Sequence, residues 1–309
     1  MKLNYYIESM PFCEIFSQYT IEEHNEKRYL IPAKKSLRKQ LSAEKNKEAM
    51  VEILNIGKKV NFGEEITDAE LISFVEKYGL LGFMEDFSAN KYYTISDNVL
   101  LRGCNFITTK DAIKSMDLIE YMKIFFPRLK DTQIKKKIKE ANKIINSSEM
   151  EQIIIQNVDR ELIFSDEYGE PIDMIIEYAK ILYQSLVGRE ISRINPIISN
   201  KCLGNEIHRV PTEYGVRFNY LKQGIDFEFL ANITVKQPLL KICWFCKKAF
   251  LADNIKAEYD SHSCKNKANV YKTRGKFVKN EIVYEDGSRT VRISKNNEVP
   301  NILRKKFIK

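Results

Sequence analysis

The sequence contains no apolar run close to the roughly 20 residues that a membrane-spanning helix needs. Its first residues also lack the basic region and apolar segment of a secretory signal peptide. Catalytic signatures are missing as well, because no Gly-rich phosphate loop, His-Glu-x-x-His helix or Gly-x-Ser-x-Gly elbow occurs. His24 and His208, two of only three histidines, stand apart from any catalytic pattern. We therefore expect a soluble, cytoplasmic protein without membrane contact, and the sequence does not suggest an enzyme.

Cysteine is also scarce, with six residues in a chain of 309. Three of the six are crowded into the C-terminal part, at Cys243, Cys246 and Cys264. This distribution is typical of reduced thiols that are partly used for metal binding, and it argues against a disulfide framework. The abundance of Lys, Ile and Asn suggests an AT-rich genome, such as a bacterial one.

Positive charge is concentrated at the C-terminal end. Residues 241–309 hold 17 Lys and Arg against 7 Asp and Glu, a net charge of +10, whereas the residues before them sum to −2. Concentrated charge of this kind favours a polyanion as partner, and nucleic acid is the commonest one. The alternative is a solvated tail that only aids solubility.

The chain is long enough for two domains, and its 44% hydrophobic content is ordinary for a protein with a buried core. We predict a mainly α protein with small β elements, divided into a mostly helical body over 1–239, a zinc finger over 240–276 and a basic β-hairpin tail over 277–309. The body should sense a ligand, oligomerise or bind a partner. In the tail, β-branched residues flank a turn at Asp286-Gly287.

Within the body, aromatic and β-branched residues predict strands near 3–7, 28–31, 92–94 and 99–107. Apolar spacing, capping residues and Pro or Gly boundaries predict helices over 34–59, from the Thr67-Asp-Ala-Glu70 capping box to Gly79, from about 115 to 126, and over 171–188. Glu167, Glu170 and Asp173 lie near the start of the last helix, where the helix dipole favours carboxylates, and we interpret them as capping residues.

A metal site is predicted by Cys243-Trp-Phe-Cys246, because a tight turn can bring two cysteines at this spacing onto one zinc ion. Cys264 follows after 17 intervening residues, an interval found between paired ligands in many zinc sites. The fourth ligand would be Asp260 or His262, since zinc accepts both carboxylate and imidazole. Imidazole is the commoner partner of thiolates, which favours His262. The alternative is that the cysteines are free thiols in a polar loop.

The segment after Cys264 has no Pro or Gly before Gly275, which predicts a helix that begins at the last ligand. A knuckle, a short hairpin with Phe250 and Leu251, and this helix together describe a treble-clef-like finger. On two adjacent faces the helix carries side chains suited to phosphates or base edges, namely Lys265, Lys267, Asn269, Lys272, Arg274 and Lys276. A basic helix that contacts no nucleic acid is the alternative.

The runs Leu240–Phe250 and Ala257–Arg274 together resemble the CGNR-type zinc fingers and related C-terminal fingers of poorly characterised bacterial proteins. The resemblance places Cys243, Cys246 and Cys264 on ligand positions and Asp260 on the third ligand position, where the family pattern has cysteine. The glycine and arginine that give these fingers their name are absent after Cys264. By analogy, the resemblance implies a transcriptional regulator with a helical sensing region, but it covers only about residues 240–276.

Three functions fit these observations. The first is a zinc-containing nucleic-acid-binding protein, specifically a regulator whose partner is DNA rather than RNA. The second is a non-enzymatic interaction or host-defence protein, in which zinc only holds the C-terminal part onto the body. The third is a nuclease or RNA-modifying enzyme built on a treble-clef finger, which the lack of a second open metal site disfavours.

Overall fold

The structure is a computed structural model, and it describes residues 5–7, 13–41, 45–84, 92–96, 99–101, 114–146, 158, 161–188, 207–210, 213–216, 220–233, 238–273, 277–283 and 289–295. Its helices are α1 (Asn46–Asn61), α2 (Asp68–Tyr78), α3 (Leu118–Phe125), α4 (Asp131–Asn146), α6 (Ile172–Gly188), α8 (Leu221–Ile233) and α9 (His262–Thr273). These helices dominate and the sheets have two or three strands each, so the predicted fold class is confirmed.

The strands form six small sheets. In the N-terminal part they are β1 (Tyr5–Ile7), β2 (Cys13–Phe16), β3 (Tyr19–His24), β4 (Lys27–Pro32) and β5 (Arg38–Leu41). Those in the middle of the chain are β6 (Tyr92–Ser96), β7 (Val99–Leu101), β8 (Lys114–Met116), β9 (Glu170–Pro171), β10 (Ile207–Val210) and β11 (Glu213–Val216). The C-terminal ones are β12 (Leu240–Ile242), β13 (Ala249–Leu251), β14 (Phe277–Val283) and β15 (Arg289–Lys295). Strand β1 runs parallel to β11, and the other pairs are antiparallel.

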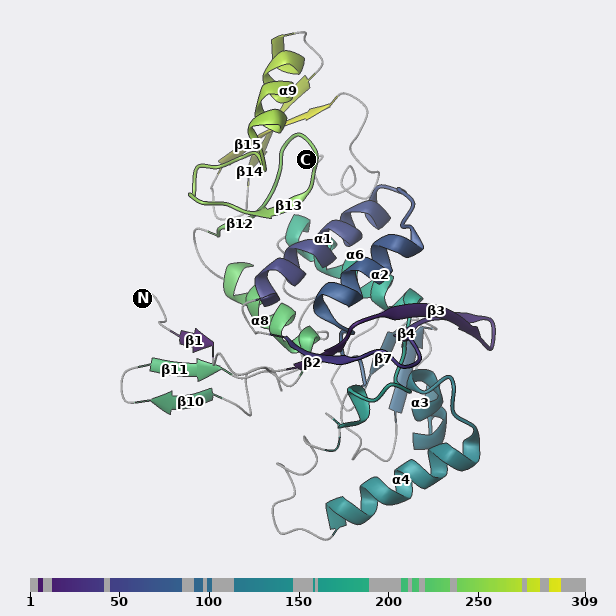
Figure 1. Ribbon diagram of the computed structural model, residues 1–309. Coiled ribbons are helices and arrows are strands. Elements are labelled where there is room, and N and C mark those ends of the chain that lie inside the picture. The colour runs from purple at the N-terminus through teal and green to yellow at the C-terminus, as the bar shows by residue number, and fades with distance from the viewer. Residues whose placement is uncertain are drawn as a thin grey trace.

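Helices α1 and α6 form the centre of the body, with α2 and α8 against α1 (Figure 1). The contact between α1 and α6 is close because Gly57 has no side chain: a Cβ there would lie 2.0 Å from the carbonyl oxygen of Ala179. Both helices carry buried apolar side chains, including Ile53 and Leu54 on α1 and Ala179 and Leu182 on α6. Small residues thus let two apolar helices meet without a gap.

Two helix starts follow their predicted capping signals. The hydroxyl of Thr67 accepts the N–H of Glu70, and the Glu70 carboxylate accepts the N–H of Thr67 in return. Asp117 and Glu120 form the same reciprocal pair at the start of α3. The prediction of one helix over 34–59 was wrong in its first half, because 38–41 pair with β2 as strand β5 and α1 begins only at Asn46.

The interpretation of Glu170 as a capping residue was also wrong. Its side chain is fully buried, and its carboxylate accepts the N–H groups of Leu81, Gly82 and Phe83 as well as the hydroxyl of Tyr168. Burial raises the pKa of Glu170, while these donors oppose the rise. The carboxylate therefore fixes the loop after α2 against β9.

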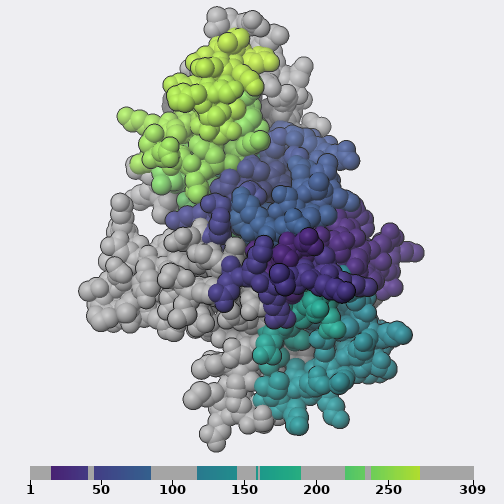
Figure 2. Space-filling model, viewed as in Figure 1, coloured from purple at the N-terminus to yellow at the C-terminus, as the bar shows by residue number. Residues whose placement is uncertain are grey.

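The C-terminal elements lie at one end of the molecule, with α9 farthest from the body and α4 at the opposite end (Figure 1). The space-filling view shows residues 238–273 next to the helices of the body (Figure 2), where β13 contacts α1. Strands β14 and β15 pair from Phe277↔Lys295 to Val283↔Arg289, which confirms the hairpin, although its turn at 286–287 lies outside the described residues. Among the described helices, none is long and apolar enough to cross a membrane. The predicted domain boundaries remain predictions.

Candidate metal centre

The first two cysteines are brought together by a tight turn between β12 and β13. The N–H of Cys243 donates to the carbonyl of Lys248 (2.8 Å), and the N–H of Lys247 donates back to the carbonyl of Cys243 (3.0 Å). Lys247 has a φ of 64°, in the left-handed region that closes such turns. The turn is therefore the knuckle that the two-residue spacing predicted.

The third cysteine is supplied by the first turn of α9. Its backbone N–H donates to the hydroxyl of Ser261 (3.2 Å), which acts as a cap just before the helix. The loop that leads to α9 is held against the knuckle, because the N–H of Trp244 donates to the carbonyl of Glu258 (3.1 Å) and the ammonium of Lys241 donates to the carbonyl of Ala257 (2.9 Å). Local hydrogen bonds thus place Cys264 opposite the knuckle.

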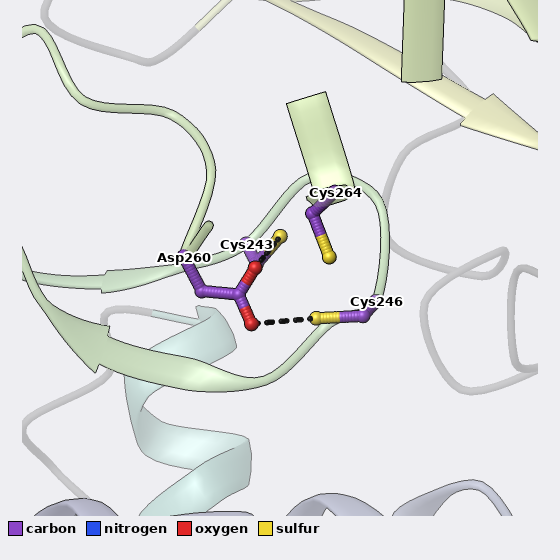
Figure 3. Close-up of side chains that lie close together, drawn as sticks. All are labelled: Cys243, Cys246, Asp260 and Cys264. Atoms are coloured by element: carbon purple, nitrogen blue, oxygen red, sulfur yellow. Dashed lines mark hydrogen bonds between the residues drawn. The ribbon is translucent and has the colours of Figure 1, made fainter. Parts of the chain in front are cut away.

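Cys243, Cys246, Asp260 and Cys264 converge on one point (Figure 3), with all four ligand atoms within 4.8 Å of one another. The Cys243 and Cys246 thiols each donate to a different oxygen of Asp260, at 3.3 Å. Ligand atoms on a tetrahedral metal with bonds of about 2.0–2.3 Å stand roughly 3.3–3.8 Å apart. The four groups could therefore hold one metal ion, which favours a metal site over free thiols in a polar loop.

The cluster includes Asp260 and leaves out His262. His262 begins α9 and is exposed to solvent, whereas the carboxylate of Asp260 faces the sulfurs. The preference for imidazole as the fourth ligand is therefore not supported by the geometry. The reason is the local backbone: His262 is only two residues from Cys264 within the first turn of the helix, where residues two apart do not face the same side.

The four groups perturb one another electrostatically. A hydrogen bond from Cys246 lowers the pKa of the Cys243 thiol to about 6 and raises that of Cys246. Burial, together with the neighbouring Asp260 carboxylate, raises the pKa of Cys264. Burial also opposes ionisation of Asp260, but hydrogen bonds from the three thiols and Ser261 outweigh it and lower the pKa of this carboxyl. The lowered pKa values of Cys243 and Asp260 favour the anionic forms that a metal ion binds.

The predicted nucleic-acid residues occupy α9 and the segment after it. Lys265, Lys267 and Asn269 are exposed on the helix, and Lys272 lies in its last turn. Arg274 and Lys276 lie outside the described residues. Ala268, between these residues in sequence, is buried. The helix therefore presents its polar side chains outward.

Two contacts that the sequence did not indicate join this region to the body. The side-chain amide of Asn55, on α1, donates to the carbonyl of Ala249 (3.1 Å) and accepts its N–H (2.8 Å). The hydroxyl of Tyr183, on α6, donates to the carbonyl of Lys247 (2.7 Å). Leu240 and Ala249 are buried in the core shared with the body. The metal knuckle is thus bonded directly to the two central helices.

No protein-family model matches this chain, and comparisons with curated proteins and with solved structures find no significant similarity.

Proposed function

We propose that the protein binds DNA through a finger, residues 240–276, that one zinc ion stabilises. The observation that carries the proposal is that a helix starting at the metal cluster exposes Lys265 and Lys267, which form no ion pair with any described residue. In this function the helical body senses a ligand or oligomerises, and the protein acts as a transcriptional regulator. The resemblance of residues 240–276 to CGNR-type fingers supports the same function by analogy.

Zinc is the metal that suits these donors best. Cys243, Cys246 and Cys264 offer thiolates and Asp260 a carboxylate, a soft, four-coordinate set that matches zinc better than calcium or magnesium. Bound zinc would supply no redox chemistry; it would cross-link the knuckle to α9. With four protein ligands the site would be closed, which is typical of a structural role.

The metal can be tested on the purified full-length protein by elemental analysis and chelator competition. We expect one equivalent of zinc in the wild type, and loss of at least tenfold in zinc affinity for Asp260→Ala. His262→Ala is the matched control, two residues away, and should leave the affinity unchanged. Zinc content well below one equivalent in freshly purified protein, or equal effects of the two variants, would contradict the assignment.

DNA binding is supported by exposed lysines on the finger, although some body lysines, such as Lys135 and Lys139 on α4, are also unpaired among the described residues. Many lysines of the body are neutralised by nearby carboxylates, as in Lys58–Glu64, Lys59–Glu70, Lys77–Glu52, Lys123–Asp131, Lys137–Glu167 and Lys180–Glu177. In the finger, the exposed side chains of Lys248, Lys256, Lys265 and Lys267 form no ion pair with any residue that the structure describes. Unpaired cations on a projecting element are available for phosphate oxygens.

Measuring the DNA affinity at increasing salt concentration would count the phosphates that the lysines of the finger contact. Each neutralised phosphate of duplex DNA contributes about −0.9 to the slope of log affinity against log salt. Lys265→Ala with Lys267→Ala should therefore reduce the slope by up to about two units and weaken binding to all sequences. The control pair is Lys135→Ala with Lys139→Ala on α4, because both lysines are exposed and unpaired among the described residues but lie at the other end of the molecule. An equal effect of both pairs, or no binding to any nucleic acid at low salt, would refute the proposal.

The second candidate, an interaction or host-defence protein with purely structural zinc, is favoured by one observation. The bonds from Asn55 and Tyr183 to the knuckle backbone fix the finger to the body, as a staple would. Helix α9 distinguishes the two functions, because a staple would bury it, whereas its Lys265, Lys267 and Asn269 are exposed. We therefore place DNA binding first.

A further inference from the structure

Two aromatic rings meet at the junction of the knuckle and α9. Phe245 lies between the ligands Cys243 and Cys246, and Tyr271 lies two turns after Cys264. Their ring centroids are 5.6 Å apart and their planes are tilted by 43°. Both side chains are half-buried, so each still presents part of its surface to solvent. The finger thus carries a partly exposed aromatic pair, which we call the Phe245–Tyr271 pair.

Positive charge lies beside this pair. Lys267 precedes Tyr271 by four residues, so both side chains share one face of α9. Lys267 is exposed and has no ion-pair partner among the described residues. Lys248, which is also exposed and unpaired there, follows Phe245 by three residues in the knuckle. The two rings and the two lysines therefore lie in the knuckle and on α9, the two parts of the finger that carry the cysteines of the metal cluster.

This combination suits unpaired bases better than duplex DNA. In a duplex the base faces are covered by their neighbours, and only phosphates and base edges can be reached. Aromatic rings beside lysines instead match single strands, where bases stack on the rings and cations follow the backbone. The ligands on either side of Phe245 would also hold its ring in place when metal is bound, which lowers the entropic cost of stacking.

We propose that the Phe245–Tyr271 pair is a stacking platform for unpaired bases of single-stranded DNA, with Lys267 on the adjacent phosphate. The proposal rests on the proposed DNA-binding function and deepens it, because it names the form of DNA that the finger takes. Pyrimidine-rich oligonucleotides without secondary structure are the probe of choice, since they leave every base unpaired.

The first experiment compares Tyr271→Leu with Tyr271→Phe in the full-length, zinc-loaded protein. Leucine keeps apolar volume but removes the ring, whereas phenylalanine keeps the ring. We expect Tyr271→Leu to lower the affinity for an oligo-dT of about 12 nucleotides by roughly 5- to 150-fold, without changing the salt slope. Tyr271→Phe should bind like the wild type. Lys267→Ala should instead reduce the slope by about 0.7, the contribution of one phosphate on a single strand.

The outcomes separate failure of the platform from failure of DNA binding. Unchanged affinity of Tyr271→Leu, while Lys265→Ala with Lys267→Ala still weakens binding, would overturn the platform and keep the proposed function. No binding of the wild type to any nucleic acid would overturn both. Tighter binding to the matching duplex or to the RNA of the same sequence than to the single-stranded DNA would also overturn the platform.

A second measurement needs no variant and therefore does not depend on whether Tyr271→Leu folds. An oligonucleotide that carries 5-iododeoxyuridine forms photochemical cross-links mainly to aromatic side chains that stack on the modified base. We expect the cross-linked peptides of the wild type to contain Phe245 or Tyr271. Cross-links that map only outside 240–276, for example to α4, would refute the platform.

Discussion

The bond between Asn55 and Ala249 allows a quantitative prediction about how the finger is held. The Asn55 amide satisfies both main-chain groups of Ala249, whose side chain is buried. Asn55→Ala would leave one N–H and one C=O without these partners at a partly buried junction. Each unsatisfied group costs about 1–3 kcal/mol, and partial access of water reduces the cost. We therefore expect docking of the finger to weaken by roughly 2–4 kcal/mol.

Hydrogen exchange measured by mass spectrometry would detect this change directly. A loss of this size accelerates exchange by roughly 30- to 1000-fold, provided that the amides of β13 exchange by local opening. The peptide that covers 249–252 should respond, while peptides from α4 should not. Ser73→Ala, at an exposed position of α2, is the control and should leave all rates unchanged. Unchanged exchange over 249–252 in Asn55→Ala with normal zinc content would show that this bond does not hold the finger.

Three further predictions concern the body. The guanidinium of Arg128 lowers the pKa of Glu22 to about 2, so this pair stabilises the fold above pH 4.5. As the pH falls from 4.5 to 2, we expect the free energy of unfolding to decrease by up to about 3 kcal/mol. The free energy of unfolding of Arg128→Ala should decrease much less in the same acid titration. Glu228 is fully buried, its carboxylate has no hydrogen-bond partner among the described residues, and burial raises its pKa. Ionisation of Glu228 therefore costs stability as the pH rises above 4.5, and Glu228→Gln should raise the melting temperature at pH 7.5 but not at pH 4.5; equal melting shifts at both pH values would contradict this reasoning. Gly57→Ala would place a methyl group 2.0 Å from the Ala179 carbonyl oxygen. We expect this variant to be destabilised by about 1–3 kcal/mol or more in urea titrations. An unfolding midpoint equal to that of the wild type would show that α1 and α6 can move apart at little cost.

Local signals predicted local structure well. The capping box at Thr67 and the knuckle at Cys243 depend on residues within a few positions, so their patterns are visible in the sequence. The backbone N–H groups that bind Glu170 lie 87 to 89 residues away, and Asn55 and Ala249 are 194 residues apart. Such pairs depend on how α1, α6 and β13 pack, which no local pattern encodes. The choice between Asp260 and His262 stayed open in the sequence for a related reason, because it depends on the direction of side chains in one turn of backbone.

The hydrogen bonds from Asn55 and Tyr183 to the finger reach its main chain. Asn55 contacts the N–H and C=O of Ala249, and Tyr183 contacts the C=O of Lys247. Every residue except proline carries these groups, so these hydrogen bonds depend on the path of the finger backbone, whereas the buried side chains of Leu240 and Ala249 add apolar contact with the body. Outward-facing residues of the finger can therefore be exchanged without undocking it. If the finger binds DNA as proposed, variation of α9 alone should therefore change what is bound while the finger stays docked on the body.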